Sequence, residues 1–368
     1  MRYYVIAGEA SGDMHGSRLV QQIHQQDPKA EIRCWGGEKM QAAGATLVKH
    51  YKELAFMGFV EVIKHLPTIF RNIRWCKQDI LSFKPDVLVL IDYPGFNLRI
   101  AKWAHQMGIK VAYYISPQVW AWKENRVKTI KKVVDTMLVI LPFEVDFYKK
   151  WDMEVTYTGH PLIEFISEVK ALPAQPSLST KPIIALLPGS RAQEIQLKLP
   201  IMLEMVALFP QYQFAVAQAP SQPNSLYTNL IGTKDVLLIP NNTYGLLLQA
   251  KAALVTSGTA TLETALIGVP QIVCYKGNAF SFWLAKKLVK VKYISLVNLI
   301  MDKLVVTELI QNDLNVAMLL STLTSMLKDE QEYLRIKSDY KELWHLLGNQ
   351  HASLKAAQAV VGLAQTLH

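Results

Sequence analysis

Short, continuous apolar runs alternate with helical patterns along most of the chain, and this alternation restricts the fold more than any other feature. Val87–Ile91 contains no polar residue, as expected for a strand that is buried on both faces of a sheet. Similar runs at Tyr3–Ala7, Lys110–Ile115 and Thr136–Ile140 are separated by segments with helical spacing. Such alternation predicts a parallel sheet with helices on both faces.

A second series of apolar runs follows a stretch rich in proline and serine. Residues 167–182 contain Pro173, Pro176 and Pro182 and lack periodicity, so we interpret them as a linker. The later runs are Ile183–Leu187, Gln213–Ala217, Val236–Ile239, Ala253–Thr256 and Gln271–Tyr275. We therefore predict an α/β protein with two doubly wound domains, 1–166 and 183–340, that face each other across a cleft. A helical tail, 341–368, could pack on the first domain or on a partner chain.

Composition narrows the setting of the protein. Lys and Arg exceed Asp and Glu by nine, which suits a nucleic acid, a membrane surface or phosphorylated substrates without choosing among them. No uncharged run approaches the ~20 residues of a spanning helix, so we expect a cytoplasmic protein, peripheral on a membrane at most. Cys34, Cys76 and Cys274 have neither metal-ligand spacing nor a disulfide pattern.

The first strand is followed at once by a glycine-containing loop, residues 8–16. Its spacing differs from the G-x-G-x-x-G fingerprint, and no acidic residue closes the next strand, so a nicotinamide cofactor is disfavoured. Glycines at a strand-to-helix turn let the backbone approach a ligand closely. An ordinary tight turn with Asp13 capping a helix explains the same residues. The candidates for ligand contact in this loop are Glu9, Ser11, Gly12 and Asp13.

Two further loops of the first half carry polar and aromatic residues. Asp92 ends the apolar run at Ile91, where α/β sheets keep their chemistry, although an Asp before Pro94 can simply turn the chain. Asn97 lies in the same loop. Trp120 and Trp122 cannot share one helical face and are followed by Lys and Arg, which suits a sugar, a phosphate or a lipid headgroup. Ordinary aromatic packing is the alternative.

The second half has two turns suited to an anion. Gly189, Ser190 and Arg191 form a turn in which backbone N–H groups and a guanidinium can hold a diphosphate, and it lacks the Lys-Ser/Thr of a P-loop. Ser257–Thr259 ends another apolar run and starts a helix, whose N-terminus favours an anion. Glu263, one turn later, can accept both hydroxyls of a ribose. A capped helix with an acidic first turn is the alternative.

These residues resemble those of the lipid A disaccharide synthase family. Eight motifs occur in the family's order, and the Ser-Pro-Gln-Val-Trp-Ala-Trp motif is the most specific. The matching segments are Gly8–Asp13, Phe56–Glu61, Ile91–Asn97, Ser116–Trp122, Gly159–Leu162, Leu187–Arg191, Ser257–Glu263 and Ser295–Asn298. The resemblance implies a GT-B fold with two Rossmann-like domains. It also implies an inverting transfer of 2,3-diacylglucosamine from its UDP derivative to the 6-hydroxyl of 2,3-diacylglucosamine 1-phosphate, giving a β-1,6 link.

The resemblance also assigns roles to individual residues. Asp92 matches the family's proposed general base, and Gly95 stands where the family often has a second carboxylate. The residues that match the UDP site are Gly189, Ser190, Arg191, Ser257, Gly258, Thr259 and Glu263, with Asn298 as a further polar position near the donor. No paired acidic motif stands near these loops, so we expect neither a cofactor nor a metal.

Two stretches combine apolar anchors with basic residues, as interfacial elements do. They span residues 56–77 and 280–293, and an amphipathic helix packed on its own domain is the alternative for each. The candidates for membrane contact are Phe59, Ile63, Phe70, Arg71, Arg74, Phe280, Phe282, Trp283, Lys286 and Lys287. We therefore expect attachment to the anionic inner face of the cytoplasmic membrane, and no nucleic acid partner. The resemblance and the helical tail suggest a homodimer.

Two other functions fit parts of the pattern. A UDP-sugar 2-epimerase has the same fold, but it would not need a lipid-binding surface or the Trp120 and Trp122 motif. A non-enzymatic module that binds anionic membranes would not need Arg191 and Glu263 around a nucleotide-shaped site. Selective stabilisation by UDP distinguishes that module from a UDP-sugar enzyme.

Overall fold

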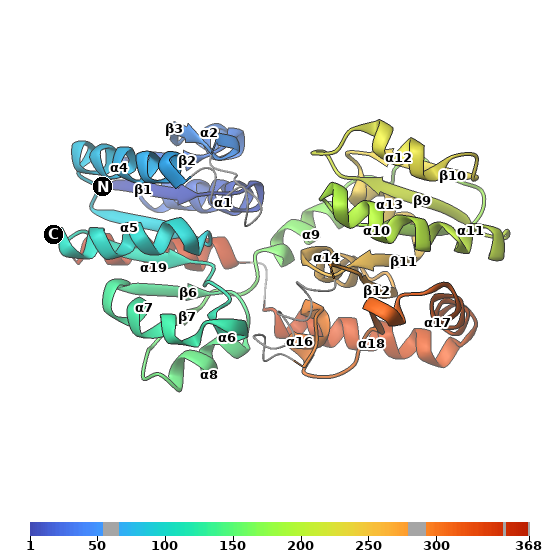
Figure 1. The fold of residues 1–368 in the computed structure, drawn as a ribbon. Coiled ribbons are helices and arrows are strands. Elements are labelled where there is room, and N and C mark those ends of the chain that lie inside the picture. Colours follow the sequence, from blue (N-terminus) through green and yellow to red (C-terminus); the bar gives the residue numbers. More distant parts are fainter. Residues whose placement is uncertain (54–65, 279–291, 349–350, 367–368) are drawn as a thin grey trace. The chain divides into compact units, whose positions relative to one another are not determined.

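A computed structural model describes residues 1–53, 66–278, 292–348 and 351–366. The chain divides into two compact units, each built on a parallel sheet (Figure 1). Unit 1 comprises Met1–Pro161 with Asn349–His368, and unit 2 comprises Leu162–Gly348. The predicted pair of Rossmann-like α/β domains is therefore confirmed.

Unit 1 has a seven-stranded sheet in the order β3-β2-β1-β4-β5-β6-β7, and every pairing is parallel. Its strands are β1 (Arg2–Ala7), β2 (Glu31–Gly36), β3 (Thr46–His50), β4 (Val87–Ile91), β5 (Lys110–Tyr114), β6 (Thr136–Val139) and β7 (Thr156–Tyr157). All five residues of β4 are buried, as its unbroken apolar run predicts.

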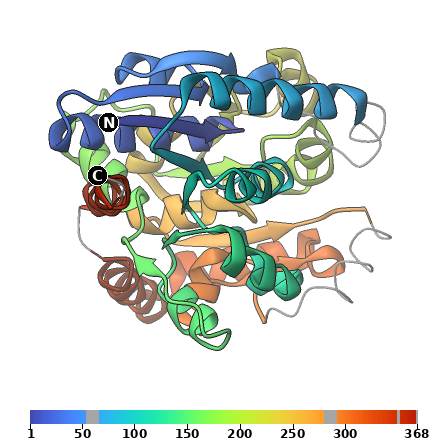
Figure 2. The ribbon, with the colours of Figure 1, turned by 90° about the vertical axis from the view of Figure 1, so that its left-hand side faces the viewer.

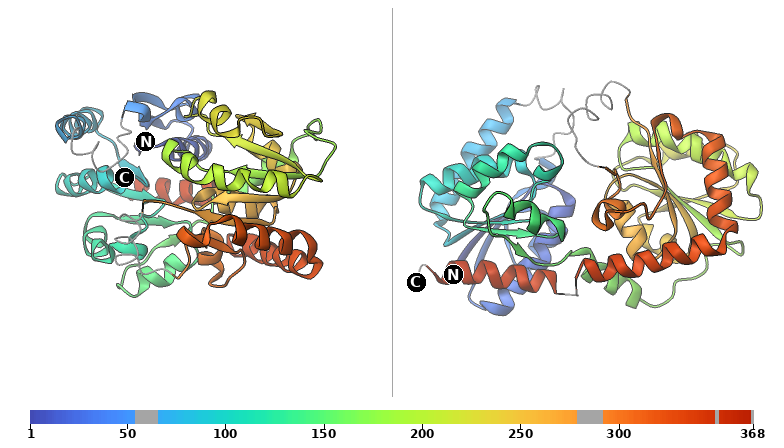
Figure 3. Two further views of the ribbon diagram at one scale, coloured as in Figure 1. Left: turned by 45° about the vertical axis from the view of Figure 1, so that its right-hand side comes forward. Right: turned by 90° about the horizontal axis from the view of Figure 1, so that it is seen from below.

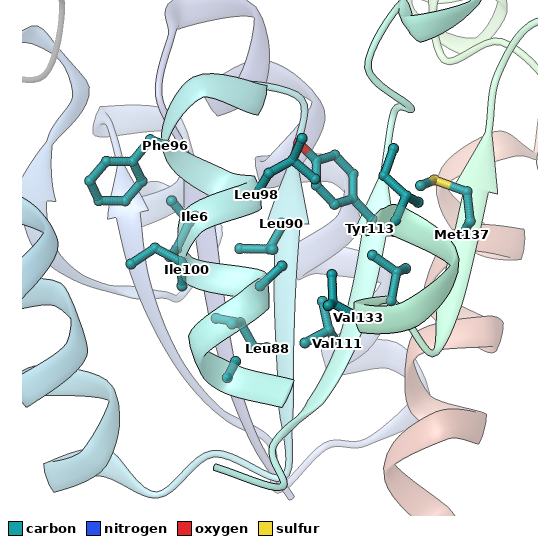
Figure 4. Close-up of a cluster of buried hydrophobic side chains, with 14 of the residues drawn as sticks. Ile6, Leu88, Leu90, Phe96, Leu98, Ile100, Val111, Tyr113, Val133 and Met137 are labelled. Carbon is teal, nitrogen blue, oxygen red and sulfur yellow. The ribbon is translucent and has the colours of Figure 1, made fainter. Parts of the chain in front are cut away.

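Helices cover both faces of this sheet, because alternate strand residues point to opposite sides. One core joins Tyr4, Ile6, Leu88 and Leu90 to helices α4, α5 and α7 (Figure 4). The other core uses the intervening strand residues with α1 and α19. The helices of unit 1 are α1 (Ala10–Gln26), α2 (Glu38–Ala42), α4 (Leu66–Phe83), α5 (Pro94–Gln106), α6 (Val119–Trp122), α7 (Val127–Val133), α8 (Phe143–Lys149) and α19 (Ala352–Gln365).

Unit 2 has a six-stranded parallel sheet in the order β10-β9-β8-β11-β12-β13. Its strands are β8 (Ile183–Leu187), β9 (Gln213–Gln218), β10 (Val236–Pro240), β11 (Ala250–Thr256), β12 (Gln271–Tyr275) and β13 (Glu308–Ile310). Its helices are α9 (Leu162–Ala171), α10 (Ala192–Leu203), α11 (Met205–Leu208), α12 (Asn224–Ile231), α13 (Thr243–Gln249), α14 (Thr259–Ile267), α16 (Leu296–Met301), α17 (Val316–Lys328) and α18 (Glu330–Leu346). Helices α17 and α18 pack on each other (Figure 3).

Two boundaries differ from those expected from the sequence. Helix α9 continues to Ala171, so regular structure occupies the start of the predicted linker, and the division between the units falls at Pro161 and Leu162. The predicted tail begins inside α18, which continues to Leu346 as part of unit 2. Within the described residues, no helix is both long enough and apolar enough to span a membrane.

The last helix returns to unit 1 and packs beside α1 and against β4, β5 and β6 (Figure 2). Its contact face consists largely of small residues, which let the helix come close to the sheet. The buried members of this face are Ala352, Ser353, Ala356, Ala357, Val360, Val361 and Ala364. Unit 1 is thus completed by the end of the chain.

Replacing Val360 by Asp should destabilise unit 1, because a carboxylate would be buried there without a partner. We expect the free energy of unfolding to fall by about 3 kcal/mol or more. Gln358→Asp is the control, since Gln358 is exposed on the same helix. Hydrogen exchange followed by mass spectrometry should report faster exchange in unit 1 peptides. Equal exchange in the two variants would contradict this account of α19.

Candidate functional site

The strand order of unit 1 brings two of the predicted loops together. Strands β1 and β4 are parallel neighbours, and Ala7 pairs with Ile91 at their carboxyl ends. The chain then leaves β1 for α1 on one face of the sheet and β4 for α5 on the other. This divergence is a topological switch point, where open α/β sheets bind their ligands. The loops that carry Glu9 and Asp92 therefore flank one position.

The main chain at Asp92 is held in an uncommon conformation. Asp92 and Tyr93 both have left-handed backbone angles, with φ of 43° and 48°. The Asp92 carbonyl accepts hydrogen bonds from the Tyr113 hydroxyl at 2.6 Å and from Asn97 Nδ2 at 2.8 Å. Asn97 Nδ2 also donates to the Ile91 carbonyl at 3.1 Å. Because such backbone angles cost about 1–3 kcal/mol each, these bonds stabilise the turn that presents the Asp92 side chain.

The environment of the Asp92 carboxylate favours its neutral form. Burial, together with the negative charge of Glu9, raises the pKa of Asp92 to about 6, although the hydrogen bond from the Tyr93 N–H lowers it. Glu9 is exposed and precedes the first turn of α1. A carboxyl group with a pKa near 6 can accept a proton close to neutral pH, which is the property of a general base.

The glycine loop before α1 serves the fold more than the sequence suggested. Asp13 is buried, and its carboxylate accepts hydrogen bonds from the N–H groups of Gly37 at 2.7 Å, Met40 at 3.1 Å and Lys39 at 3.2 Å. It thus caps α2, which gives Asp13 a structural role in unit 1. A side chain at Gly8 would approach the Tyr93 ring to 2.3 Å. The close contact that the lack of a side chain at Gly8 permits is therefore with the Tyr93 ring.

Other members of that loop set lie in different environments. Ser11 is exposed in the first turn of α1, next to the exposed Glu9. Gly12 is buried against β1, where an added Cβ would approach the Ala7 Cβ to 3.1 Å. Glu9 and Ser11 are therefore the two members of this loop set with side chains at the surface.

The two tryptophans of α6 have different roles, as their spacing predicts. Trp120 is half-buried and packs edge-to-face on Phe143, with ring centroids 4.9 Å apart. The Trp122 side chain is 51% exposed, with Lys123 Nζ 4.1 Å from its ring centroid and Arg126 Cζ 5.9 Å away. Only Trp122 therefore offers an aromatic and basic surface to a ligand.

A buried carboxyl group that the sequence did not single out lies close to this motif. Glu144, on α8, accepts hydrogen bonds from the N–H groups of Leu141 at 3.0 Å and Ile140 at 3.2 Å. Although these backbone hydrogen bonds lower its pKa, burial raises it to about 7. Nothing in the spacing of Glu144 distinguishes it from a surface residue of a short helix.

Unit 2 repeats the arrangement of unit 1 with different chemistry. Strands β8 and β11 are parallel neighbours, with Leu187 paired to Val255. The turn after β8 contains Gly189 with φ of 126°, and the turn after β11 contains Gly258 with φ of 142°, where only glycine is unstrained. The parallel register brings together the loops predicted to bind a diphosphate. Their predicted contacts are Gly189, Ser190, Arg191, Ser257, Gly258 and Thr259.

Exposure differs among the residues of these two turns. The Arg191 side chain is 66% exposed, and its guanidinium is a long 3.7 Å from Glu194. Ser190 is exposed, whereas its carbonyl accepts a hydrogen bond from Gln222 Nε2 at 2.9 Å. Gly258 and Thr259 are exposed at the start of α14, and the Ser257 hydroxyl donates to the Ile294 carbonyl at 2.9 Å. The cation and the helix N-terminus are thus accessible to an anion.

Glu263 lies in the second turn of α14 and is hydrogen-bonded to Tyr244 of α13. Burial raises the pKa of Glu263, whereas the Tyr244 bond lowers it. The Tyr244 ring packs edge-to-face on Phe165 of α9, with centroids 4.9 Å apart. The sequence did not indicate Tyr244, because α13 and α14 meet only through the sheet topology.

Asn298 was expected near a donor ligand, but its side chain is used inside unit 2. Its Nδ2 donates to the Val306 carbonyl at 2.8 Å and to Glu308 Oε1 at 2.9 Å. Its Oδ1 accepts from the N–H groups of Val305 at 2.9 Å and Val306 at 3.0 Å. Two donors and two lone pairs exhaust the capacity of an amide. The structure therefore corrects the expectation that Asn298 contacts the donor.

The membrane-contact candidates fall partly outside the described residues. Phe59, Ile63, Phe280, Phe282, Trp283, Lys286 and Lys287 lie there. On α4, Phe70 is 59% exposed, and Arg71 and Arg74 are exposed as well. Ile69 and Ile73 point to the core. Helix α4 thus packs on its own unit with one face and presents apolar and basic residues on the other.

The described residues contain no group of three or more His, Cys, Asp or Glu side chains that could hold a metal ion. The three cysteines are buried and free.

Comparison with known proteins decides the family. The family model described as lipid-A-disaccharide synthetase matches residues 3–362. The chain belongs to this family. The lipid-A-disaccharide synthase of Trichlorobacter lovleyi is 36% identical over 375 residues, covering 99% of this chain and 98% of that protein. The synthase of Hahella chejuensis is 38% identical over 377 residues, covering 99% and 95%. The family resemblance of the motifs is confirmed, and the chain is a glycosyltransferase of lipid A biosynthesis.

Solved structures support the GT-B fold. A UDP-GlcNAc 2-epimerase from Neisseria meningitidis, bound to UDP-GlcNAc, matches with a TM-score of 0.67 at 12% identity, covering all of both chains. The kitacinnamycin glycotransferase matches with a TM-score of 0.68 at 12% identity, covering 99% of each. Identities this low establish the fold alone, so family membership rests on the sequence relatives.

Replacing Asn298 by Asp should destabilise unit 2. The change removes both donated hydrogen bonds and sets a carboxylate beside Glu308. We expect the free energy of unfolding to fall by about 2–4 kcal/mol in urea titrations. Asn229→Asp, at an exposed position of α12, is the control and should change little. Unchanged stability together with lost binding of UDP would restore the donor-contact role.

Proposed function

We propose that the enzyme transfers 2,3-diacylglucosamine from its UDP derivative to the 6-hydroxyl of 2,3-diacylglucosamine 1-phosphate. The products are the β-1,6-linked disaccharide 1-phosphate and UDP, and the anomeric centre is inverted. Family membership supports the reaction class. The observation that carries the catalytic assignment is Asp92, presented by a strained turn at a switch point with a pKa of about 6.

Asp92 acts as the general base in this proposal. Its ionised carboxylate takes the proton of the acceptor 6-hydroxyl while that oxygen attacks the anomeric carbon of the donor. The bond from this carbon to the diphosphate oxygen breaks, and its electron pair leaves with UDP. Asn97 and Tyr113 support the step by fixing the Asp92 main chain, because a misdirected base loses much of its effect.

The two turns of unit 2 bind the donor in this proposal. Arg191 holds the diphosphate oxygens through its guanidinium, and the backbone N–H groups that begin α14 supply further donors. The turns at Gly189 and Ser190 and at Ser257, Gly258 and Thr259 surround it. These groups stabilise the negative charge that grows on the leaving UDP.

Glu263 accepts the ribose hydroxyls of the donor in this proposal. Burial raises the pKa of Glu263, and the hydrogen bond from Tyr244 opposes this by favouring the ionised form, which is the form that accepts two hydroxyl groups. The UDP-GlcNAc bound to the Neisseria meningitidis neighbour supports a UDP-sugar as the ligand class for this fold.

An epimerase reaction is the alternative that the solved neighbours suggest. It would change the donor sugar without an acceptor. Incubation with UDP-2,3-diacylglucosamine and 2,3-diacylglucosamine 1-phosphate, followed by mass spectrometry, separates the two. A disaccharide that forms only when both substrates are present supports the transferase. An altered UDP-sugar formed without an acceptor would favour the epimerase.

In that assay, Asp92→Asn should lower turnover by about 10²–10⁴, because it removes the base and keeps the shape. Asp146→Asn, at an exposed position of α8, serves as the control. Since the base must be ionised, wild-type kcat/KM should rise with pH through about 6 and then level off. That rise should be absent in Asp92→Asn. Wild-type turnover in the Asn variant would exclude Asp92 as the base.

We further propose that the enzyme attaches peripherally to the anionic inner face of the cytoplasmic membrane, where acylated substrates are found. The exposed face of α4 supports this, since Phe70 adjoins Arg71 and Arg74. Basic residues add about 1 kcal/mol each near an anionic surface, and salt screens them, whereas an inserted ring resists salt.

Vesicle flotation tests the role of α4. Phe70→Ser should weaken binding to phosphatidylglycerol-containing vesicles in high salt, because the inserted ring is lost. The double variant Arg71→Gln, Arg74→Gln should weaken binding in low salt by about 2 kcal/mol. Leu334→Ser is a matched control, because Leu334 is also 59% exposed but lies on α18. Wild-type flotation of all three variants would show that α4 is not the membrane surface.

A further inference from the structure

A lysine is buried next to the two donor turns of unit 2. Lys198 lies on α10, seven residues after Arg191, and its side chain is only 2% exposed. It is one of the largest fully buried side chains in the described part of the chain. Lysine is almost never fully buried unless its charge has a partner, since an isolated buried charge is costly. The position of Lys198 therefore calls for a reason.

The contacts of Lys198 join the two donor turns. Its Nζ donates to the hydroxyl of Thr256, the residue directly before Ser257. The same Nζ is 3.8 Å from Glu194 Oε2, and Glu194 Oε1 is 3.7 Å from Arg191 Nη1. Glu194 also lies against the turn after β8, where a Cβ on Gly189 would be 2.5 Å from its Oε2. Glu194 is therefore shared between two cations.

The charges of this cluster do not cancel. Arg191 and Lys198 contribute two positive charges and Glu194 one negative charge, which leaves one positive charge beside the N-terminus of α14. Among the ion pairs of the described residues, Glu194 is the one carboxylate within reach of Lys198. A diphosphate in the adjacent turns would supply the missing negative charge.

We propose that Lys198 is a positioning residue for the diphosphate of the sugar nucleotide. It holds Glu194 and Thr256, through which it orients Arg191 and the turn at Ser257, and its charge raises the positive potential there. The inference rests on the proposed donor site and assigns Lys198 an indirect role there, through Glu194 and Thr256. A purely structural role would not distinguish UDP from uridine, because removing one partner of the buried pair with Glu194 destabilises the fold whichever ligand is offered.

Calorimetric titration of Lys198→Met with UDP and with uridine tests the proposal. Methionine keeps the length of the side chain and removes the charge. We expect UDP to bind about tenfold more weakly and uridine to bind as to the wild type, because only UDP has the diphosphate. Lys337→Met is the control, since the half-buried Lys337 donates to the Gly268 carbonyl at the other end of α14. It should leave both affinities unchanged.

The outcomes separate this inference from the proposed function. A wild-type protein that does not bind UDP refutes the proposed donor site itself. Wild-type binding of UDP with unchanged affinity in Lys198→Met overturns the role of Lys198 alone. An equal loss for UDP and uridine would assign Lys198 to the fold instead. Thr256→Val provides a second variant if Lys198→Met does not fold, and it should also weaken UDP selectively.

The pH dependence of UDP affinity gives an independent reading. Burial lowers the pKa of Lys198, Arg191 adds to this, and Glu194 and Cys274 oppose it. The Cys274 thiol stays neutral, because burial raises its pKa to about 12. UDP affinity should fall at alkaline pH as Lys198 loses its proton, at a lower pH than for a lysine in water, and the affinity of uridine measured in parallel accounts for ionisation of the uracil ring. Lys198→Arg should remove the part of this fall that is specific to UDP, whereas equal pH profiles for UDP and uridine in the wild type would contradict the charge role.

Discussion

The parallel pairing of β1 with β4, and of β8 with β11, fixes where chemistry can occur in each unit. In each pair the two strands are parallel, so the loops that follow them start side by side at the same edge of the sheet. Side chains such as Asp92 and Arg191 come from short turns that could not hold a conformation alone. They are positioned because buried strands such as β4 and β8 anchor the turns at one end. Every local feature of the candidate sites therefore depends on the pairing of strands that are distant in sequence.

Much of this framework could be predicted from the sequence, because buried central strands consist almost entirely of apolar residues. The runs at Val87–Ile91 and Ile183–Leu187 match β4 and β8 residue for residue. The edge strands β3, β7 and β13 could not be predicted in this way, since they are only partly buried and their apolar signal is weak. Similarly, α9 extends into a segment whose prolines and serines indicated a linker.

For the residues of the candidate site, a different property decides what could be predicted from the sequence. A motif shows that residues occur together, but it does not show which atoms their side chains contact. Asp13 and Asn298 belong to motifs as specific as those of Asp92 and Arg191, yet their polar atoms bind main-chain groups of the fold. Those partners are brought close by tertiary structure, so spacing alone cannot separate scaffold from ligand contact. Lys198 shows the reverse case. A lysine in an amphipathic helix is normally on the solvent face, so nothing in the sequence indicated that Lys198 is buried beside the candidate site.

Burial shifts the pKa of one important ionisable group in each unit, upward for a carboxyl group and downward for an amine. In unit 1 it raises the pKa of Asp92 and so favours the neutral carboxyl, whereas in unit 2 it lowers the pKa of Lys198 and so favours the neutral amine. The proposed reaction moves a proton to the first group and negative charge toward the second. Protonation of Asp92 relieves its desolvation, and a departing diphosphate stabilises the charge of Lys198. In the proposed reaction the cost of each buried charge is thus largest before the transfer and smaller along it, and such a difference would favour the transition state over the bound substrates.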